Sequence, residues 1–188
     1  MENFNIDLKK FSEYVVNIIY DVNNFDINNT EEQKVSPLKL QNILYFLYAY
    51  ALSTWNKTLW SNNFEKWVIG PVIPELYYDY SKNGVRLFNL EEHFVKIPEI
   101  RNWDRFDLEA LVIDLSKKYN DIELAKLAHD DVWKNTDISS IMKAEDIAKY
   151  YSEYETFIDE IVNDPTIENN ISIFSEKCLK IWNIKLVE

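Results

Sequence analysis

Apolar side chains recur at helical spacing over most of the chain, which predicts a mainly α-helical fold. The strongest pattern runs from Ser36 to about Trp55, where Ser36 is a good N-cap and Pro37 suits the first helical position. The residues of its apolar stripe are Leu40, Ile43, Leu44, Leu47, Tyr48 and Ala51. Tyr45, Phe46 and Tyr50 widen this stripe until little of the helix circumference is polar. Such a helix is expected to run through the middle of a domain rather than over its surface.

Weaker patterns complete the predicted architecture. Helical periodicity predicts further helices near residues 6–23, 74–83, 104–119, 121–128, 143–163 and 171–182. Alternation over Phe64–Val68 predicts a short strand that stops at Gly70-Pro71, and residues 85–88 and 94–97 could pair with it. The predicted fold class is mainly α, a compact bundle of about six or seven helices around a central apolar helix, with a small β element beside the Gly-Pro segment.

Composition supports a folded protein with no need for disulfides. The chain has 188 residues, of which 47% are hydrophobic and 15% aromatic, so one domain is expected over residues 1–164, followed by a helical appendage over 165–188. Cys178 is the single cysteine, and charged residues near the N-terminus argue against a secretory signal. No apolar run reaches the roughly 18 residues of a membrane span. We therefore expect a cytoplasmic protein with no membrane partner.

The formal net charge of −12 narrows the class of partner. Nucleic-acid binding depends on Lys and Arg neutralising phosphates, so nucleic acid is not expected as the main partner. An acidic protein approaches a basic protein faster, although the charge taken alone is better explained as an ordinary acidic composition with no role in binding. A surface that imitates DNA is a further alternative, which would require patterned carboxylates.

Two runs carry a resemblance to a known family. The run S-P-L-K-L-Q-N-I-L-Y-F from Ser36 and the run F-E-K-W-V-I-G-P-V-I-P-E-L-Y from Phe64 resemble the Panacea domain of SocA-like antitoxins, which also occurs in phage-associated proteins. The matching positions are Lys39, Leu40, Gln41, Leu44, Tyr45, Leu59, Phe64, Glu65, Trp67, Gly70, Pro71, Val72, Pro74, Leu76 and Tyr77. Ala128–Trp133 and Ile147–Tyr151 are similar to later elements of the family pattern. The departures are Ile69, a shortened spacing from His129 to Trp133, and the tail after Asp164.

The resemblance implies an antitoxin that neutralises a cognate protein toxin, encoded by the adjacent gene, through direct contact. A protease or a chaperone is a further partner considered on the same ground. The alternative is a phage or mobile-element interaction protein that inhibits or delivers a host protein and has no toxin partner. A third alternative, from another class, is a small hydrolase that uses carboxylates or His129.

Candidate catalytic and metal-binding residues are few. A Cys178–His129 dyad is conceivable, but Cys178 lies in a predicted helix among Ile and Leu residues, as a buried cysteine would, and we expect nothing there to activate its thiol. His129, Asp130 and Asp131, with Glu123 two turns earlier, could suggest a metal site, yet adjacent helical residues diverge by about 100°. The paired carboxylates Glu31-Glu32, Glu91-Glu92 and Asp130-Asp131 are expected by chance in so acidic a chain. We therefore expect no enzyme activity, no cofactor and no metal. His129 is expected to be structural, making a hydrogen bond near the helix end and packing beside Trp133.

Candidate partner-binding residues gather around Gly70-Pro71: Leu59, Trp60, Lys66, Val72 and Tyr78. Leu59 and Trp60 lie in a polar segment, where a contact role and a core role are equally open. Alternation along the strand predicts Trp67 on the inner side and Lys66 on the opposite side, toward solvent or a partner. The residues assigned a structural role in the motif are Ser36, Pro37, Leu40, Gln41, Leu44, Tyr45, Trp67, Gly70, Pro71, Pro74, Tyr77, His129 and Trp133.

Overall fold

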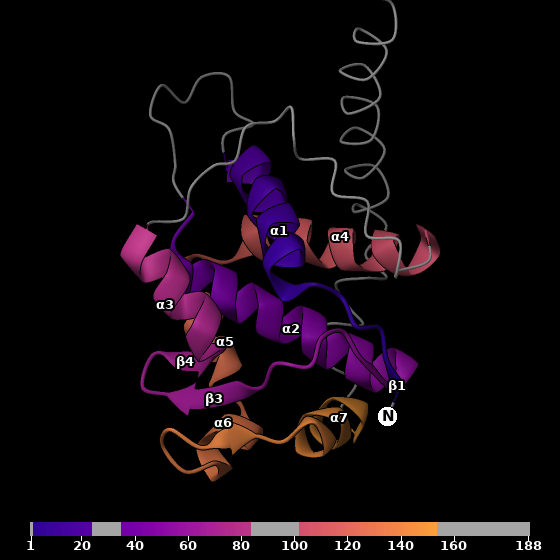
Figure 1. The fold of residues 1–188 in the computed structure, drawn as a ribbon, viewed down its shortest axis with the longest axis vertical. Helices are drawn as coiled ribbons and strands as arrows, with labels where there is room; N and C mark the ends of the chain where they lie inside the picture. Colours follow the sequence, from indigo (N-terminus) through magenta and orange to yellow (C-terminus); the bar gives the residue numbers. More distant parts are fainter. Residues whose placement is uncertain (1, 24–34, 84–101, 154–188) are drawn as a thin grey trace, which may run out of the picture.

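A computed structural model of the chain describes residues 2–23, 35–83 and 102–153, and it confirms the mainly α prediction. The described part holds seven helices and short strands (Figure 1). The elements are β1 (Glu2–Asn3), α1 (Leu8–Asn23), α2 (Pro37–Trp55), β2 (Lys57–Thr58), β3 (Phe64–Trp67), β4 (Gly70–Val72), α3 (Pro74–Asn83), α4 (Asn102–Lys118), α5 (Asp121–Ala128), α6 (Asp131–Asn135), β5 (Ile141–Met142) and α7 (Ala144–Glu153). The predicted strands at 85–88 and 94–97, the helix at 171–182 and the appendage at 165–188 lie outside the described residues.

Helix α2 is the central element that its sequence pattern predicts. The Ser36 hydroxyl accepts a hydrogen bond from the Lys39 amide at 3.0 Å, and the helix ends where Asn56 turns to a φ of 53°. Every side chain from Lys39 to Leu52 is buried. In Figure 1, α2 runs through the middle of the fold, with α1 and α4 on one side and the β3–β4 hairpin, α6 and α7 on the other. The prediction of a central helix is confirmed.

The main sheet has partners that differ from the predicted ones. Its strand order is β4-β3-β5, with both pairs antiparallel. The chain does not stop pairing at Gly70-Pro71 as predicted, because Gly70–Val72 folds back as β4 and places Gly70 opposite Trp67. In β5, Ile141 lies opposite Glu65 of β3. Strands of two or three residues are too short to carry a recognisable alternation, so the sequence pattern misses them.

The segment between α2 and β3 is covered rather than exposed. β2 pairs in parallel with β1, and the Ile6 amide donates to the Leu59 carbonyl at 3.0 Å. Leu59 and Trp60 are therefore buried, and the Trp60 ring stacks on Tyr48 at 5.3 Å and packs against Phe11 at 5.7 Å. Both residues belong to the hydrophobic core.

A carboxyl group is enclosed where α1 packs against α4. The Tyr14 hydroxyl donates a hydrogen bond to Glu109 Oε1. Burial raises the pKa of Glu109 to about 7, because the ionised carboxylate loses solvation there. Arg105 Nε lies 3.4 Å from the same oxygen.

Shortening the apolar side chains of α2 should destabilise the protein. Leu44 and Leu47 have no exposed surface, so Leu44→Ala or Leu47→Ala should lower the free energy of unfolding by about 2–5 kcal/mol through lost contacts and a cavity. Ile122→Ala is the matched control, since this side chain is 65% exposed on α5. Urea unfolding measures all three variants. Equal midpoints for the two Leu variants and the wild type would contradict the central position of α2.

Glu109 should make the protein less stable as pH rises through the weakly acidic range. Its carboxyl keeps its proton to a higher pH in the folded state than in the unfolded chain, so the folded state binds more protons between pH 4.5 and 7. Stability is therefore greatest below the unfolded pKa and falls until pH 7, by at most about 3 kcal/mol from this group. Glu109→Gln should flatten that part of a pH series of urea unfolding. An unchanged slope would show that Glu109 ionises normally.

Candidate partner-binding surface

The β3–β4 hairpin turns at a position that only glycine accommodates. Gly70 has a φ of 125°, a left-handed value that side chains rarely adopt. A Cβ atom at this position would also lie 3.0 Å from Asn42 Oδ1 and 3.8 Å from His129 Nε2. The hairpin can therefore pack closely against α2 and the end of α5 because Gly70 carries no side chain.

Exposed apolar and aromatic side chains gather at this hairpin and at the neighbouring helix α3. Val68 is 77% exposed at the hairpin tip, and Tyr78 is 62% exposed on α3. The half-buried Trp67 ring lies 5.2 Å from the ring of Tyr77 and 5.6 Å from that of Tyr78. We call Trp67, Val68, Tyr77 and Tyr78 the hairpin surface. Aromatic residues of this kind contribute much of the binding energy in protein interfaces.

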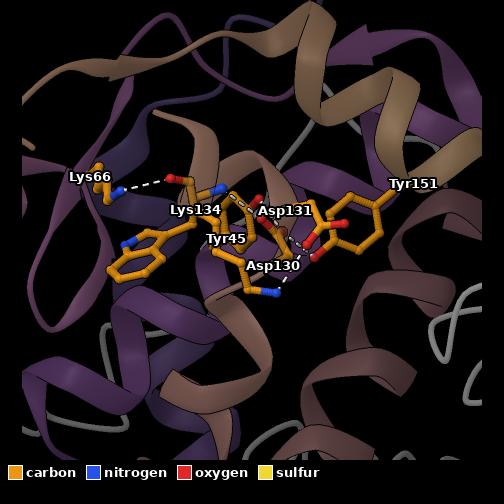
Figure 2. Close-up of polar contacts among 7 residues, drawn as sticks. Tyr45, Lys66, Asp130, Asp131, Lys134 and Tyr151 are labelled. Atoms are coloured by element: carbon orange, nitrogen blue, oxygen red, sulfur yellow. Dashed lines mark hydrogen bonds and ion pairs between the residues drawn. The ribbon is translucent and has the colours of Figure 1, made fainter. Parts of the chain in front are cut away.

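Helix α6 holds the hairpin from behind. The Trp133 indole N–H donates to the Trp67 carbonyl at 3.0 Å. Lys66 Nζ donates to the carbonyl of Lys134 at 3.1 Å (Figure 2). It also donates to the carbonyl of Thr136 at 2.7 Å, and it lies 4.5 Å from the centre of the Trp133 ring. A cation is favourable at this end of a helix, where carbonyl groups have no helical partner. These contacts fix the backbone that presents Trp67 and Val68.

His129 completes the packing behind the hairpin. Its ring stacks on Trp133, with centres 3.9 Å apart and planes 14° from parallel. Burial lowers the pKa of His129, Asp130 opposes this, and the charges of Lys66 and Lys134 lower it further. The imidazole is therefore neutral at physiological pH, and among the described residues its buried Nε2 has no hydrogen-bond partner. The predicted packing beside Trp133 is confirmed, whereas the predicted structural hydrogen bond is not found at Nε2 within the described part of the chain.

Asp130 connects three helices through one buried carboxylate. Its Oδ2 accepts hydrogen bonds from Tyr45 at 2.6 Å and Tyr151 at 2.9 Å, and its Oδ1 accepts one from the Trp133 amide at 2.8 Å (Figure 2). Burial raises the pKa of Asp130, and these hydrogen bonds oppose the rise. Burial also raises the pKa of both tyrosines well above 10, so their hydroxyls remain donors. The carboxylate thus links α2, α6 and α7.

Residues of the sequence motif therefore meet in space although they are far apart in the chain. Gln41 adds a further link, since its Oε1 accepts from the Ile73 amide at 2.9 Å and holds the end of β4 against α2. The motif residues that support the hairpin in this way are Gln41, Tyr45, Gly70, His129 and Trp133, whereas Trp67 and Tyr77 belong to the hairpin surface itself. The other motif residues have roles within α2 itself. The helix begins at Ser36 and Pro37, and the core includes Leu40 and Leu44.

Four of the five predicted contact residues have other roles. Leu59, Trp60 and Val72 are buried, so their assignment to a contact surface is wrong. Lys66 points away from Trp67 as predicted, but its ammonium group is held by α6 instead of facing solvent. Tyr78 is exposed, as a contact residue must be.

Sequence reasoning also missed several residues of this region. Trp67 is half-buried against α3 rather than facing the core as predicted, because Phe64 takes the inner side of β3 and strand alternation places Trp67 on the other side. The exposure of Val68 was not predicted. Its position shortly before Gly70-Pro71, where a turn is expected, is the sequence signal for this exposure. The role of Asp130 was not predicted, because a hydrogen-bonding partner 85 positions away leaves no local pattern.

The candidate catalytic and metal-binding residues are separated. His129 stacks on Trp133, Asp130 is turned inward to the tyrosines, and Asp131 pairs on the surface with Lys134 at 3.0 Å. Glu123 accepts from the Asn120 amide in the capping box that starts α5. Over the three described ranges, no three His, Cys, Asp or Glu side chains come together as a metal site. Cys178 and the Glu31-Glu32 and Glu91-Glu92 pairs lie outside these ranges.

Comparisons with protein-family models, curated proteins and solved structures give no match to this chain. The resemblance to the Panacea family therefore remains a prediction from the motif residues. Of the helices in the described ranges, none combines the length and the apolar character needed to cross a membrane.

Removing the charge of Asp130 should destabilise the protein far more than the same change one residue later. In Asp130→Asn, the amide nitrogen replaces an acceptor oxygen that the tyrosine hydroxyls or the Trp133 amide need, so the free energy of unfolding should fall by about 2–3 kcal/mol. Asp131→Asn is the matched control, because Asp131 is exposed and its ion pair with Lys134 lies in solvent. Urea unfolding at neutral pH compares the two. Equal effects would show that the buried hydrogen bonds to Asp130 are unimportant.

Proposed function

We propose that this protein is an antitoxin that neutralises a cognate protein toxin by direct contact. The observation that carries the proposal is that the motif residues behind the resemblance converge to hold one exposed aromatic surface. Gly70 lets the hairpin pack closely, and Tyr45, His129 and Trp133 lie behind it, while Val68 and Tyr78 are exposed. A scaffold that fixes an apolar surface suits a binding protein.

The rigid backing of the hairpin favours binding. Association normally has a cost in conformational entropy when loops and side chains become ordered. The hydrogen bonds from Trp133 to the Trp67 carbonyl and from Lys66 to α6 order the hairpin before a partner arrives. A smaller part of the interaction energy is then lost on binding.

The charge of the chain supports the same proposal. A net charge of −12 accelerates encounter with a positively charged protein and slows encounter with nucleic acid. Toxins that act on RNA or nucleotides carry basic surfaces to bind phosphates, so an acidic antitoxin would be steered to them. The toxin itself is expected from the gene next to this one.

Co-expression with the neighbouring gene tests the proposal. Induction of the neighbour alone should stop growth, and simultaneous expression of this protein should restore colony formation. His129→Gln separates binding from catalysis: a hydrolase that depends on His129 would lose rescue while the protein stayed folded. An antitoxin that acts by contact should lose rescue only as far as folded protein is lost, as measured by its unfolding midpoint. A neighbour that is harmless when expressed alone would contradict the proposal.

A further inference from the structure

The hairpin surface continues across the outer face of the sheet. Ile141 in β5 is 52% exposed and lies directly opposite Glu65 in β3. The Glu65 carboxylate accepts a hydrogen bond at 3.1 Å from the indole N–H of Trp67, two residues further along the strand. Cross-strand partners and alternate residues of a strand share one face. Ile141, Glu65 and Trp67 therefore form a row that leads to Tyr78 on α3.

Ile138 is a further exposed apolar residue close to this face. It is 58% exposed in the turn after α6, where the Ser139 amide donates to the Lys66 carbonyl at 2.8 Å. The turn is thus tied to the same strand that carries Glu65 and Trp67. The apolar side chains of the face come from the hairpin, from α3 and from the β5 segment. Backbone hydrogen bonds join β5 to β3, and ring contacts join Trp67 to Tyr77 and Tyr78 on α3.

Carboxylates accompany these apolar side chains. Glu65 lies within the row, Glu75 is exposed one turn before Tyr78 on α3, and Asp137 is exposed next to Ile138. Lys66 does not offset them on this face, because α6 holds its ammonium group on the other side of the strand. Lys82 and Lys143 are the other exposed lysines of these segments. Lys82 follows Tyr78 by one turn on α3 and Lys143 follows Ile141 by two positions, so Glu65, Glu75 and Asp137 stand against two lysines. The face is therefore apolar at its centre, with one carboxylate in the row and a small acidic excess beside it.

We propose that the toxin docks on this face, and that its own contact surface is an apolar recess bordered by Lys or Arg. This inference rests on the proposed function and adds to it the location of the contact and the chemistry of the partner. Tyr78, Val68 and Ile141 enter the recess, and the basic residues pair with Glu65 and Glu75. Aromatic and aliphatic anchors with a charged surround are typical of protein interfaces that are both tight and selective.

The test uses the purified product of the neighbouring gene as the probe. Its dissociation constant is measured by calorimetry for the wild type, Val68→Ser, Tyr78→Ser and Ile141→Ser. Each substitution should weaken binding by at least about tenfold, since it removes an anchor from the centre of the interface. Ile122→Ser is the matched control, because it removes an equally exposed apolar side chain from α5 and should leave the dissociation constant unchanged. Unfolding midpoints confirm that every variant is folded.

A second measurement tests the basic character of the toxin surface. Glu65→Gln retains an acceptor for the Trp67 indole but removes the charge, and Glu75→Gln removes a charge next to Tyr78. Both should slow association, and the association rate of the wild type should fall as salt increases. Association rates that do not depend on salt or on these charges would overturn the basic-surface assignment.

The outcomes separate this inference from the proposed function. If the neighbour's product binds but the anchor variants bind as well as Ile122→Ser, the docking face is wrong and the antitoxin function stands. If the product does not bind the wild type at all, both fail. Light scattering adds one more outcome: a dimer of this protein that Tyr78→Ser converts to a monomer would assign the face to self-association and overturn the proposal.

Discussion

The burial of α2 around its whole circumference is the constraint on which the rest of the structure depends. An amphipathic helix needs cover on one side, but α2 must be covered on all sides, since every residue from Lys39 to Leu52 is removed from solvent. Helices α1 and α4 supply one side, and α5, α7 and the β3–β4 hairpin supply the other. The remaining elements are arranged as a shell around one helix, which explains how a chain of this size encloses so many large aromatic side chains.

The polar groups of α2 decide which element occupies which place in that shell. Lys39 Nζ reaches the Ser116 carbonyl at the end of α4, Gln41 binds the Ile73 amide after β4, and Tyr45 binds Asp130 before α6. A buried polar group without its partner is costly, so a shifted arrangement of the shell would be less stable. Apolar burial drives the chain together, and these few hydrogen bonds select one arrangement.

Features set by neighbouring residues could be predicted from the sequence, and features set by distant residues could not. Ser36 and Pro37 mark the start of α2 because capping depends on adjacent positions. Leu59 and Trp60 were ambiguous because their cover, β1 and α1, comes from residues about fifty positions earlier. The outer face was only partly predictable: Tyr78 could be proposed from its type and surroundings, whereas Ile141 joins the face through a two-residue strand.

The residues that support the hairpin differ from the exposed residues that would contact a partner, so the partner-contacting residues can change while the fold is kept. The residues that hold the hairpin act through backbone carbonyls, a glycine without a side chain and a buried carboxylate, so they place no requirement on what Val68 or Tyr78 is. Exposed positions can therefore change with little effect on the fold, because surface substitutions away from such networks usually alter stability by about 0.5 kcal/mol or less. One scaffold could in this way carry different contact surfaces, and the motif residues would identify the scaffold without identifying its partner.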